Sequence, residues 1–161
     1  MPLFASAIDD PWKIFTPYRI FSLAVGAALA VALFLTLVWV RTVPGDLPAA
    51  SFLTFNIEQI RVTRSTIRVR GWALERGQDF KKYANTVVLR GKEGTFALPT
   101  KIINRSDVQR NFAEDGRLYE RSGFQAKGAR LLLPKGAYRV LILHETNAGR
   151  FFADTGKDVT L

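Results

Sequence analysis

The chain has 161 residues, of which 48% are hydrophobic, and a formal net charge of +9. This apolar content excludes a chain that is disordered throughout, and the length suits one domain of ordinary size together with an anchor. The absence of cysteine excludes disulfides, thiolate metal sites and cysteine nucleophiles.

The first element along the chain is the stretch 20–40, IFSLAVGAALAVALFLTLVWV, which carries no charge. At about 1.5 Å per residue, a helix of this length reaches roughly the 30 Å of a bilayer core. Tyr18 and Trp39 lie near its ends, as interfacial aromatic residues do. A buried helix and a cleaved signal peptide are the alternatives, but the apolar region of a signal peptide has only about 7 to 15 residues. We therefore predict a single retained transmembrane helix over 20–40.

The charges beside this span favour a short cytoplasmic tail at residues 1–19. Lys13 and Arg19 precede the span and Arg41 follows it, and positive residues are more frequent on the cytoplasmic side of a membrane. The C-terminal domain is then expected outside a bacterial inner membrane, in the periplasm or beyond.

Small residues inside the span are suited to close packing against another membrane helix. Gly26 and Ala30 form a small-xxx-small pair, although such pairs are frequent by chance and a plain anchor is the alternative interpretation. The candidate packing residues are Ala24, Gly26, Ala27, Ala28 and Ala30.

Two prolines and a glycine in residues 41–51 predict a short stiff linker. Turn signals then recur at short intervals over 52–161, which is typical of an all-β sandwich. We predict a mainly β domain there, an immunoglobulin-like antiparallel β-sandwich with one short helix. The predicted strands are 52–62, 66–74, 86–90, 95–98, 124–133, 138–145 and 150–154.

The short helix is predicted in SDVQRNF, residues 106–112. Ser106 is placed to cap it, and Gln109 follows three residues later as in a capping box. Tight turns are predicted at GKEG, residues 91–94, at LPKG, residues 133–136, and at TNAG, residues 146–149.

The stretch TIRVRGWALE, residues 66–75, begins as an alternating strand with one apolar and one basic face. Counting by two puts Trp72 on the basic face, where it would stack beside Arg70 as a platform for sugar rings or lipid headgroups. Glycine inside a strand marks a bulge or a close backbone approach. A bulge at Gly71 would instead turn Trp72 into the core, and this second interpretation is favoured because a buried Trp contributes roughly 4 to 6 kcal/mol.

The positive excess belongs to the predicted β domain, since 20 Lys and Arg but only 12 Asp and Glu follow residue 41. A solvated sheet face is the plain interpretation of this charge. The functional one is a surface for anionic lipid, acidic glycan or another negatively charged partner. Nucleic acid is not expected as a partner outside the membrane. The candidate binding patch comprises Arg61, Arg64, Arg68, Arg70 and Trp72.

The sequence predicts no enzyme. His144 is the only histidine, and it shares strand phase with Tyr138, Val140 and Ile142, as expected of a residue near the end of a buried strand face. No G-x-S-x-G or S-x-x-K motif occurs. The carboxylates near the short helix are interpreted as a solvated loop plus helix N-terminal charge, because their spacing fits no calcium loop. We predict no catalytic residue, metal or cofactor.

Five short motifs occur in the order found in a β-sandwich module of bacterial cell-surface glycan proteins. They are Gly71-Trp72-Ala73-Leu74-Glu75, Gly91 to Gly94, Arg105-Ser106-Asp107-Val108, Ser122-Gly123-Phe124 and Leu133-Pro134-Lys135-Gly136. The module runs as G-W-A-x-D, a G-rich turn, R-P-D-V, S-G-F and L-P-x-G. The chain resembles it over residues 66–161. Glu75 and Ser106 depart from it, replacing Asp and Pro.

The resemblance implies an accessory domain, because the similar modules are attached to membrane glycosyltransferases and polysaccharide-assembly proteins. It also implies structural roles for Asp107 and Ser122. The expected function is therefore a non-catalytic, membrane-anchored accessory subunit with a multispan membrane partner, in surface-polysaccharide or lipid-linked sugar assembly. The alternative is a stand-alone module that binds glycan or anionic lipid.

Overall fold

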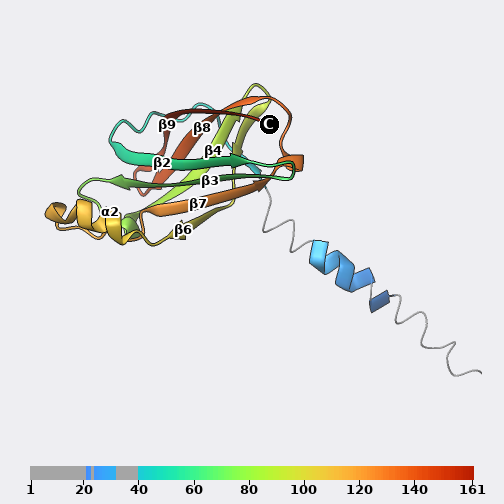
Figure 1. Cartoon of the computed structure of the whole chain (residues 1–161), viewed down its shortest axis with the longest axis horizontal. Coiled ribbons are helices and arrows are strands. Elements are labelled where there is room, and N and C mark those ends of the chain that lie inside the picture. Colours follow the sequence, from blue (N-terminus) through green and yellow to red (C-terminus); the bar gives the residue numbers. More distant parts are fainter. Residues whose placement is uncertain (1–20, 23, 32–39) are drawn as a thin grey trace, which may run out of the picture. The chain divides into compact units, whose positions relative to one another are not determined.

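Alternating apolar and polar residues build two antiparallel β-sheets, seen in a computed structural model of the chain (Figure 1). The structure describes residues 21–22, 24–31 and 40–161. The chain divides into two units, Met1–Leu37 and Val38–Leu161.

In the first unit, residues 21–22 and 24–31 are helical. Among the described residues, no helix combines the length and apolar character that a membrane crossing requires. The rest of the predicted span, residues 20, 23 and 32–39, lies outside the described residues, as does the predicted tail at 1–19. The candidate packing residues Ala24, Gly26, Ala27, Ala28 and Ala30 are exposed.

The second unit contains a five-stranded sheet and a four-stranded sheet (Figure 1). In spatial order, the first sheet is β1 (Arg41–Thr42), β5 (Gly94–Ala97), β4 (Tyr83–Gly91), β8 (Ala137–Thr146) and β9 (Gly149–Thr160). The second is β2 (Leu53–Val62), β3 (Thr66–Glu75), β7 (Gly123–Ala129) and β6 (Thr100–Ile103). The helical segments are η1 (Phe80–Lys82), α2 (Ser106–Asn111), η2 (Ala113–Asp115) and η3 (Arg130–Leu132).

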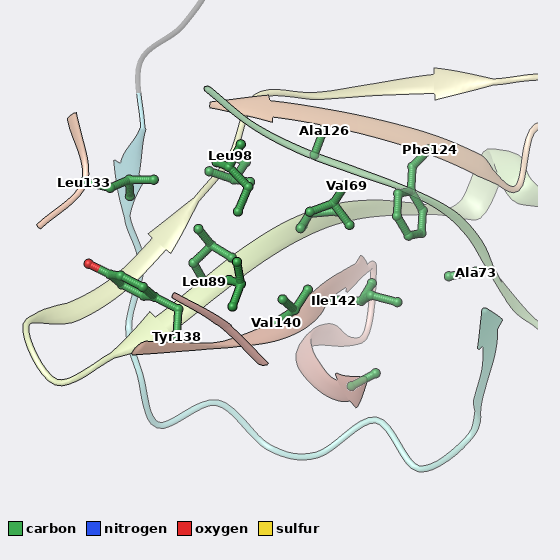
Figure 2. Packing of buried hydrophobic residues seen from close by; sticks show 14 of the residues in the cluster. Val69, Ala73, Leu89, Leu98, Phe124, Ala126, Leu133, Tyr138, Val140 and Ile142 are labelled. Atoms are coloured by element: carbon green, nitrogen blue, oxygen red, sulfur yellow. The ribbon is translucent and has the colours of Figure 1, made fainter. Parts of the chain in front are cut away.

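The main hydrophobic core lies between the two sheets. Figure 2 shows Val69 and Phe124 from the four-stranded sheet facing Leu89, Val140 and Ile142 from the five-stranded sheet. All five are almost completely buried. The prediction of a mainly β sandwich with one short α-helix is therefore confirmed for the second unit.

The predicted strands are confirmed with changed bounds. The strand predicted over 124–133 ends at Ala129, because the chain there turns into η3 and buries Leu133. β9 extends to Thr160, beyond the predicted end at residue 154. The edge strand β6 was not predicted, since four residues between a proline and a helix offer little alternation to detect.

The short helix is present, but its predicted capping box is wrong. Ser106 is the first residue of α2, and Arg105 occupies the N-cap without a side-chain hydrogen bond. The Gln109 side chain instead accepts from the backbone N–H of Tyr119 and donates to the carbonyl of Arg117 at 2.9 Å. Gln109 therefore ties the loop after α2 back onto the helix.

The segment 41–51, expected as a linker, is attached to the sandwich at several points. β1 pairs with β5, and Val43 and Leu47 pack on the outer side of the five-stranded sheet against Leu141 and its neighbours. Ala49 forms a parallel bridge with Phe152. The domain boundary therefore lies before Arg41 and not at residue 52.

Neither interpretation of Gly71 describes β3 fully. The alternation continues through the strand, with Gly71 facing the core and Trp72 on the arginine face. The bulge lies in the partner strand instead, where Glu58 is the extra residue between Ile57 and Gln59. Gly71 is a close backbone approach: a Cβ there would overlap the carbonyl oxygen of Asn56 and lie 3.1 Å from Cζ of Phe124.

We predict that Gly71→Ala lowers the free energy of unfolding by about 1–3 kcal/mol, because the added methyl group meets backbone that cannot move aside. Gly45→Ala is the control, since its Cβ would meet only the Thr95 hydroxyl at 3.3 Å. That control should change stability by less than about 0.5 kcal/mol. Urea unfolding followed by circular dichroism measures both. Equal stability of Gly71→Ala and the parent would contradict the observed register.

Candidate functional site

Three cations form a row across the outer face of the four-stranded sheet. Arg61 on β2 lies directly opposite Arg68 on β3, and Arg68 lies directly opposite Lys127 on β7. Residues paired in this way point to the same face, with Cβ atoms about 4.5–5.5 Å apart. All three are exposed. We call this set the cation row.

A second row beside it mixes cations with amides. Gln59, Arg70, Gln125 and Lys101 are successive partners across β2, β3, β7 and β6. The two rows together place five cations and two amide side chains on one exposed sheet face, which we call the basic face. It comprises Arg61, Arg68, Lys127, Gln59, Arg70, Gln125 and Lys101.

Among the described residues, Glu58 is the one carboxylate that forms an ion pair with a cation of the basic face. Glu58, displaced outward by the bulge, lies 3.8 Å from Nε of Arg70 but 2.6 Å from Nη1 of Arg105. Among the described residues, no carboxylate lies within ion-pair distance of Arg61, Arg68, Lys101 or Lys127. Apart from the contact between Glu58 and Arg70, no ion pair among the described residues offsets the positive charge of the basic face.

The structure brings together three of the four predicted arginines. Arg61, Arg68 and Arg70 lie on the basic face, whereas Arg64 lies in the turn between β2 and β3. Lys101, Lys127 and the two glutamines were missed. The alternation of QAKGA, residues 125–129, indicates a charged face, but nothing in the sequence shows that β7 lies beside β3.

Trp72 shares the face of Arg70 but is not an open platform. It packs beside Leu74, Val108 and Tyr119, and its ring lies edge-on to Phe112 with centroids 5.8 Å apart. The segment around α2 thus half-buries Trp72 against the outer side of the sheet. Both predictions for Trp72 are therefore corrected: it is neither an open stacking platform nor a residue of the core between the sheets.

Arg105 links the edge of the basic face to the helix. Its side chain is only 12% exposed, and its guanidinium reaches Glu58 on one side and Asp107 on the other at 2.6 Å each. The hydrogen bond from Arg105 holds the pKa of Asp107 far below its usual range, and both partners raise the pKa of Arg105. Arg105 and Asp107 therefore hold the start of α2 in place, while the backbone of Ser122 pairs with Ala73.

His144 is fully buried on β8, as predicted, and belongs to a polar cluster with Asn85 and Glu75. Asn85 donates Nδ2–H to the carbonyl of Ala73 at 2.8 Å, so its Oδ1 faces Nδ1 of His144 at 2.7 Å. An amide oxygen only accepts, so Nδ1 of His144 carries the proton. Nε2 then faces Oε2 of Glu75 at 3.2 Å.

Burial lowers the pKa of His144, and the nearby Glu75 opposes that shift without reversing it. Tyr83 and Phe52 cover the ring, with centroids 5.0 Å and 5.8 Å from that of His144. The cluster fastens β3 and β4 to β8 across the sandwich, which is a structural role.

The carboxylates near α2 form ion pairs with two different arginines, and Asp107 pairs with Arg105. Glu114 and Asp115 both pair with Arg76, at 3.3 and 3.2 Å. The hydrogen bond from Arg76 lowers the pKa of Asp115, which also accepts from Tyr119 Oη at 3.1 Å. Within residues 21–22, 24–31 and 40–161, no three acidic or histidine side chains are grouped as metal ligands.

Comparison of the chain with models of known families, with curated proteins and with solved structures found no match.

We predict that the free energy of unfolding decreases when the pH is lowered from 7.5 to 5. The pKa of His144 is lower in the folded protein than its ordinary value of about 6.5, so the unfolded chain binds the proton first. The stabilisation is present above that value and is lost as the pH falls toward the pKa of the folded state. The slope is at most about 1.4 kcal/mol per pH unit.

Urea unfolding of the parent and of His144→Gln at several pH values measures this slope. His144 is the only histidine, so the variant should show a nearly flat dependence between pH 5 and 7.5. A parent protein that becomes more stable on acidification in this range would show that His144 is charged in the fold.

Proposed function

We propose that this chain is a non-catalytic, membrane-anchored binding protein whose β-sandwich holds an acidic glycan on the basic face. The observation that carries the proposal is the cation row of Arg61, Arg68 and Lys127. Like charges directly opposite one another destabilise a sheet, and no carboxylate among the described residues compensates the row. A polyanion lying across β2, β3 and β7 would compensate it.

The chemistry of the face favours a charged glycan over a neutral one. Arginine guanidinium groups bind carboxylate or sulfate in a two-pronged geometry, and Gln59 and Gln125 supply donors and acceptors for hydroxyl groups beside them. Neutral sugar rings usually need an exposed aromatic surface, and Trp72 is half-buried under α2. The ligand is therefore expected to be recognised mainly through its negative charge.

The anchor is supported by the sequence of residues 20–40, whose length and apolar character suit a bilayer. In this proposal, residues 1–19 are cytoplasmic and the sandwich lies outside a bacterial inner membrane. An acidic surface glycan is a ligand of that side, and nucleic acid is not expected there.

We also infer that the sandwich is immunoglobulin-like. Its orders β2-β3-β7-β6 and β5-β4-β8-β9 correspond to the ABED and C′CFG orders of that architecture. Immunoglobulin-like sandwiches carry many unrelated functions, so this inference concerns the fold only. The proposed ligand depends on the basic face.

A second candidate function, an accessory subunit of a surface-polysaccharide assembly complex, is favoured by the arrangement of the glycan-module motifs. Gly71 and Trp72 pair with Phe124 and Gly123, and Val108 packs beside Trp72. Three motifs that are far apart in sequence therefore meet at one end of the four-stranded sheet. Their convergence supports the resemblance to modules attached to membrane glycosyltransferases.

We predict that the double substitution Arg68→Ser/Lys127→Ser abolishes binding of the full chain to an immobilised acidic polysaccharide such as alginate. The same change should leave stability equal or slightly increase it, by a few tenths of a kcal/mol, because it removes like-charge repulsion. Retention of the detergent-solubilised protein on the polysaccharide, as a function of salt, measures binding. Urea unfolding measures stability.

Arg110→Ser/Arg117→Ser is the matched control, since it removes two exposed cations near α2 instead of two on the basic face. The control should retain nearly parental binding at the same salt concentration. Equal loss in both variants would show that only total charge matters and would refute a site on the basic face. Binding of anionic vesicles but not of acidic polysaccharide would assign the face to lipid.

For the second candidate, we predict that the tagged full chain, purified from its own membranes in mild detergent, retains a multispan glycosyltransferase or transporter in stoichiometric amount. Mass spectrometry of the purified sample identifies such a partner. A chain that emerges alone at every detergent strength would argue against a stable accessory subunit and would leave the glycan-binding proposal unaffected.

A further inference from the structure

One end of the sandwich presents leucines and cations together. Leu131 in η3 is 94% exposed, and its neighbour Leu132 is 41% exposed. Isolated exposed leucines are common on proteins. Here they project from a rigid turn, because Leu133 is buried in the core and its N–H donates to the carbonyl of Arg130 at 3.1 Å.

The turn between β2 and β3 supports η3 from the side. The N–H of Arg130 donates to the carbonyl of Ser65 at 2.9 Å, and its guanidinium reaches the carbonyl of Thr63 at 3.5 Å. These bonds place Arg64 and Arg130 beside the exposed leucines. The leucines and the arginines therefore belong to one surface, held by backbone hydrogen bonds between two segments.

A hollow of about 380 Å³ opens at this end. Arg64, Arg130 and Lys135 supply three cations, and the rest of the lining is leucine: Leu131, Leu133 and Leu161. No acidic side chain lines the hollow, and no carboxylate of the described residues forms an ion pair with these three cations. We call this surface the leucine–cation end.

The described part of the sandwich also begins at this end. Val40 packs on the main core, and a Cβ on Gly128, two residues before Arg130, would lie 3.7 Å from Cγ2 of Val40. Val40, the last residue of the predicted span, is thus adjacent to the leucine–cation end.

We propose that the leucine–cation end binds the surface of an anionic lipid bilayer. This inference rests on the proposed membrane anchor, since the anchor brings this end to the bilayer. Leu131 and Leu132 would enter the boundary between headgroups and acyl chains, as apolar side chains of interfacial segments do. Arg64, Arg130 and Lys135 would meet the negative headgroups, and one phosphate group would occupy the hollow between them.

The combination of exposed leucines and surrounding cations favours a bilayer over a protein as the binding partner of the leucine–cation end. A protein partner would bury the leucines in a matching apolar pocket, whereas the three cations around them match a surface that is apolar inside and negatively charged at its rim. The proposal gives the sandwich a preferred orientation. It would stand on the membrane at η3 and the β2–β3 turn, with the α2 end away from the lipid.

The absence of cysteine in the chain makes a site-specific test practical. Leu131→Cys in the full chain would be labelled with an environment-sensitive dye and reconstituted into nanodiscs. One set of discs contains phosphatidylcholine alone, and the other also contains phosphatidylglycerol. We expect blue-shifted emission and several-fold stronger quenching by nitroxide-bearing lipid in the anionic discs, reduced by high salt.

Leu118→Cys is the matched position, because Leu118 is also exposed, at 55%, but lies near η1 at the other end of β3. A dye there should show no lipid quenching. Arg64→Ser/Lys135→Ser should abolish most of the quenching at position 131, whereas Arg110→Ser/Arg117→Ser should not. The Arg64→Ser/Lys135→Ser variant keeps Arg130, because the hydrogen bonds from Arg130 to the β2–β3 turn support the fold.

Quenching at position 131 no stronger than at position 118, or unaffected by lipid charge, would overturn the inference while leaving the anchor intact. Failure of the chain to incorporate into either kind of disc would overturn the anchor and this inference together. Incorporation of the Arg64→Ser/Lys135→Ser variant into the discs reports on the anchor alone. It therefore distinguishes failure of the anchor from failure of the leucine–cation end to bind lipid.

Discussion

The two-residue alternation of β3 is the constraint on which the rest of the domain depends. β3 lies inside the four-stranded sheet, so every side chain on it must face either the core or the outer surface. Ile67, Val69 and Gly71 face inward, and Arg68, Arg70 and Trp72 face outward. A bulge in β3 would have exchanged the faces, and the bulge at Glu58 in β2 leaves them unchanged while carrying a carboxylate to the outer surface.

The outer face is divided into two parts by what covers it. At one end, α2 and its loop cover Trp72, and the Arg105 network holds them there. Beyond that cover, the face is open and carries cations without compensating carboxylates in the described chain. The same strand therefore contributes to a structural contact at one end and to the proposed ligand surface along its middle.

The basic face and the leucine–cation end both contain groups that lower the stability of the fold. Arg61, Arg68 and Lys127 repel one another, and Leu131 is left in water. The buried His144 differs, because its Nδ1 donates to Oδ1 of Asn85 at 2.7 Å.

The sequence by itself determined the β-strands with strong alternation, the tight turns and the buried position of His144, because each depends on neighbours within a few residues. It also indicated a close backbone approach at Gly71. Only the tertiary structure decided which strand carries the bulge, that β7 brings Lys127 beside Arg68, and that α2 covers Trp72. Strand partners and covering segments come from distant parts of the chain, and their choice depends on the packing of the whole core.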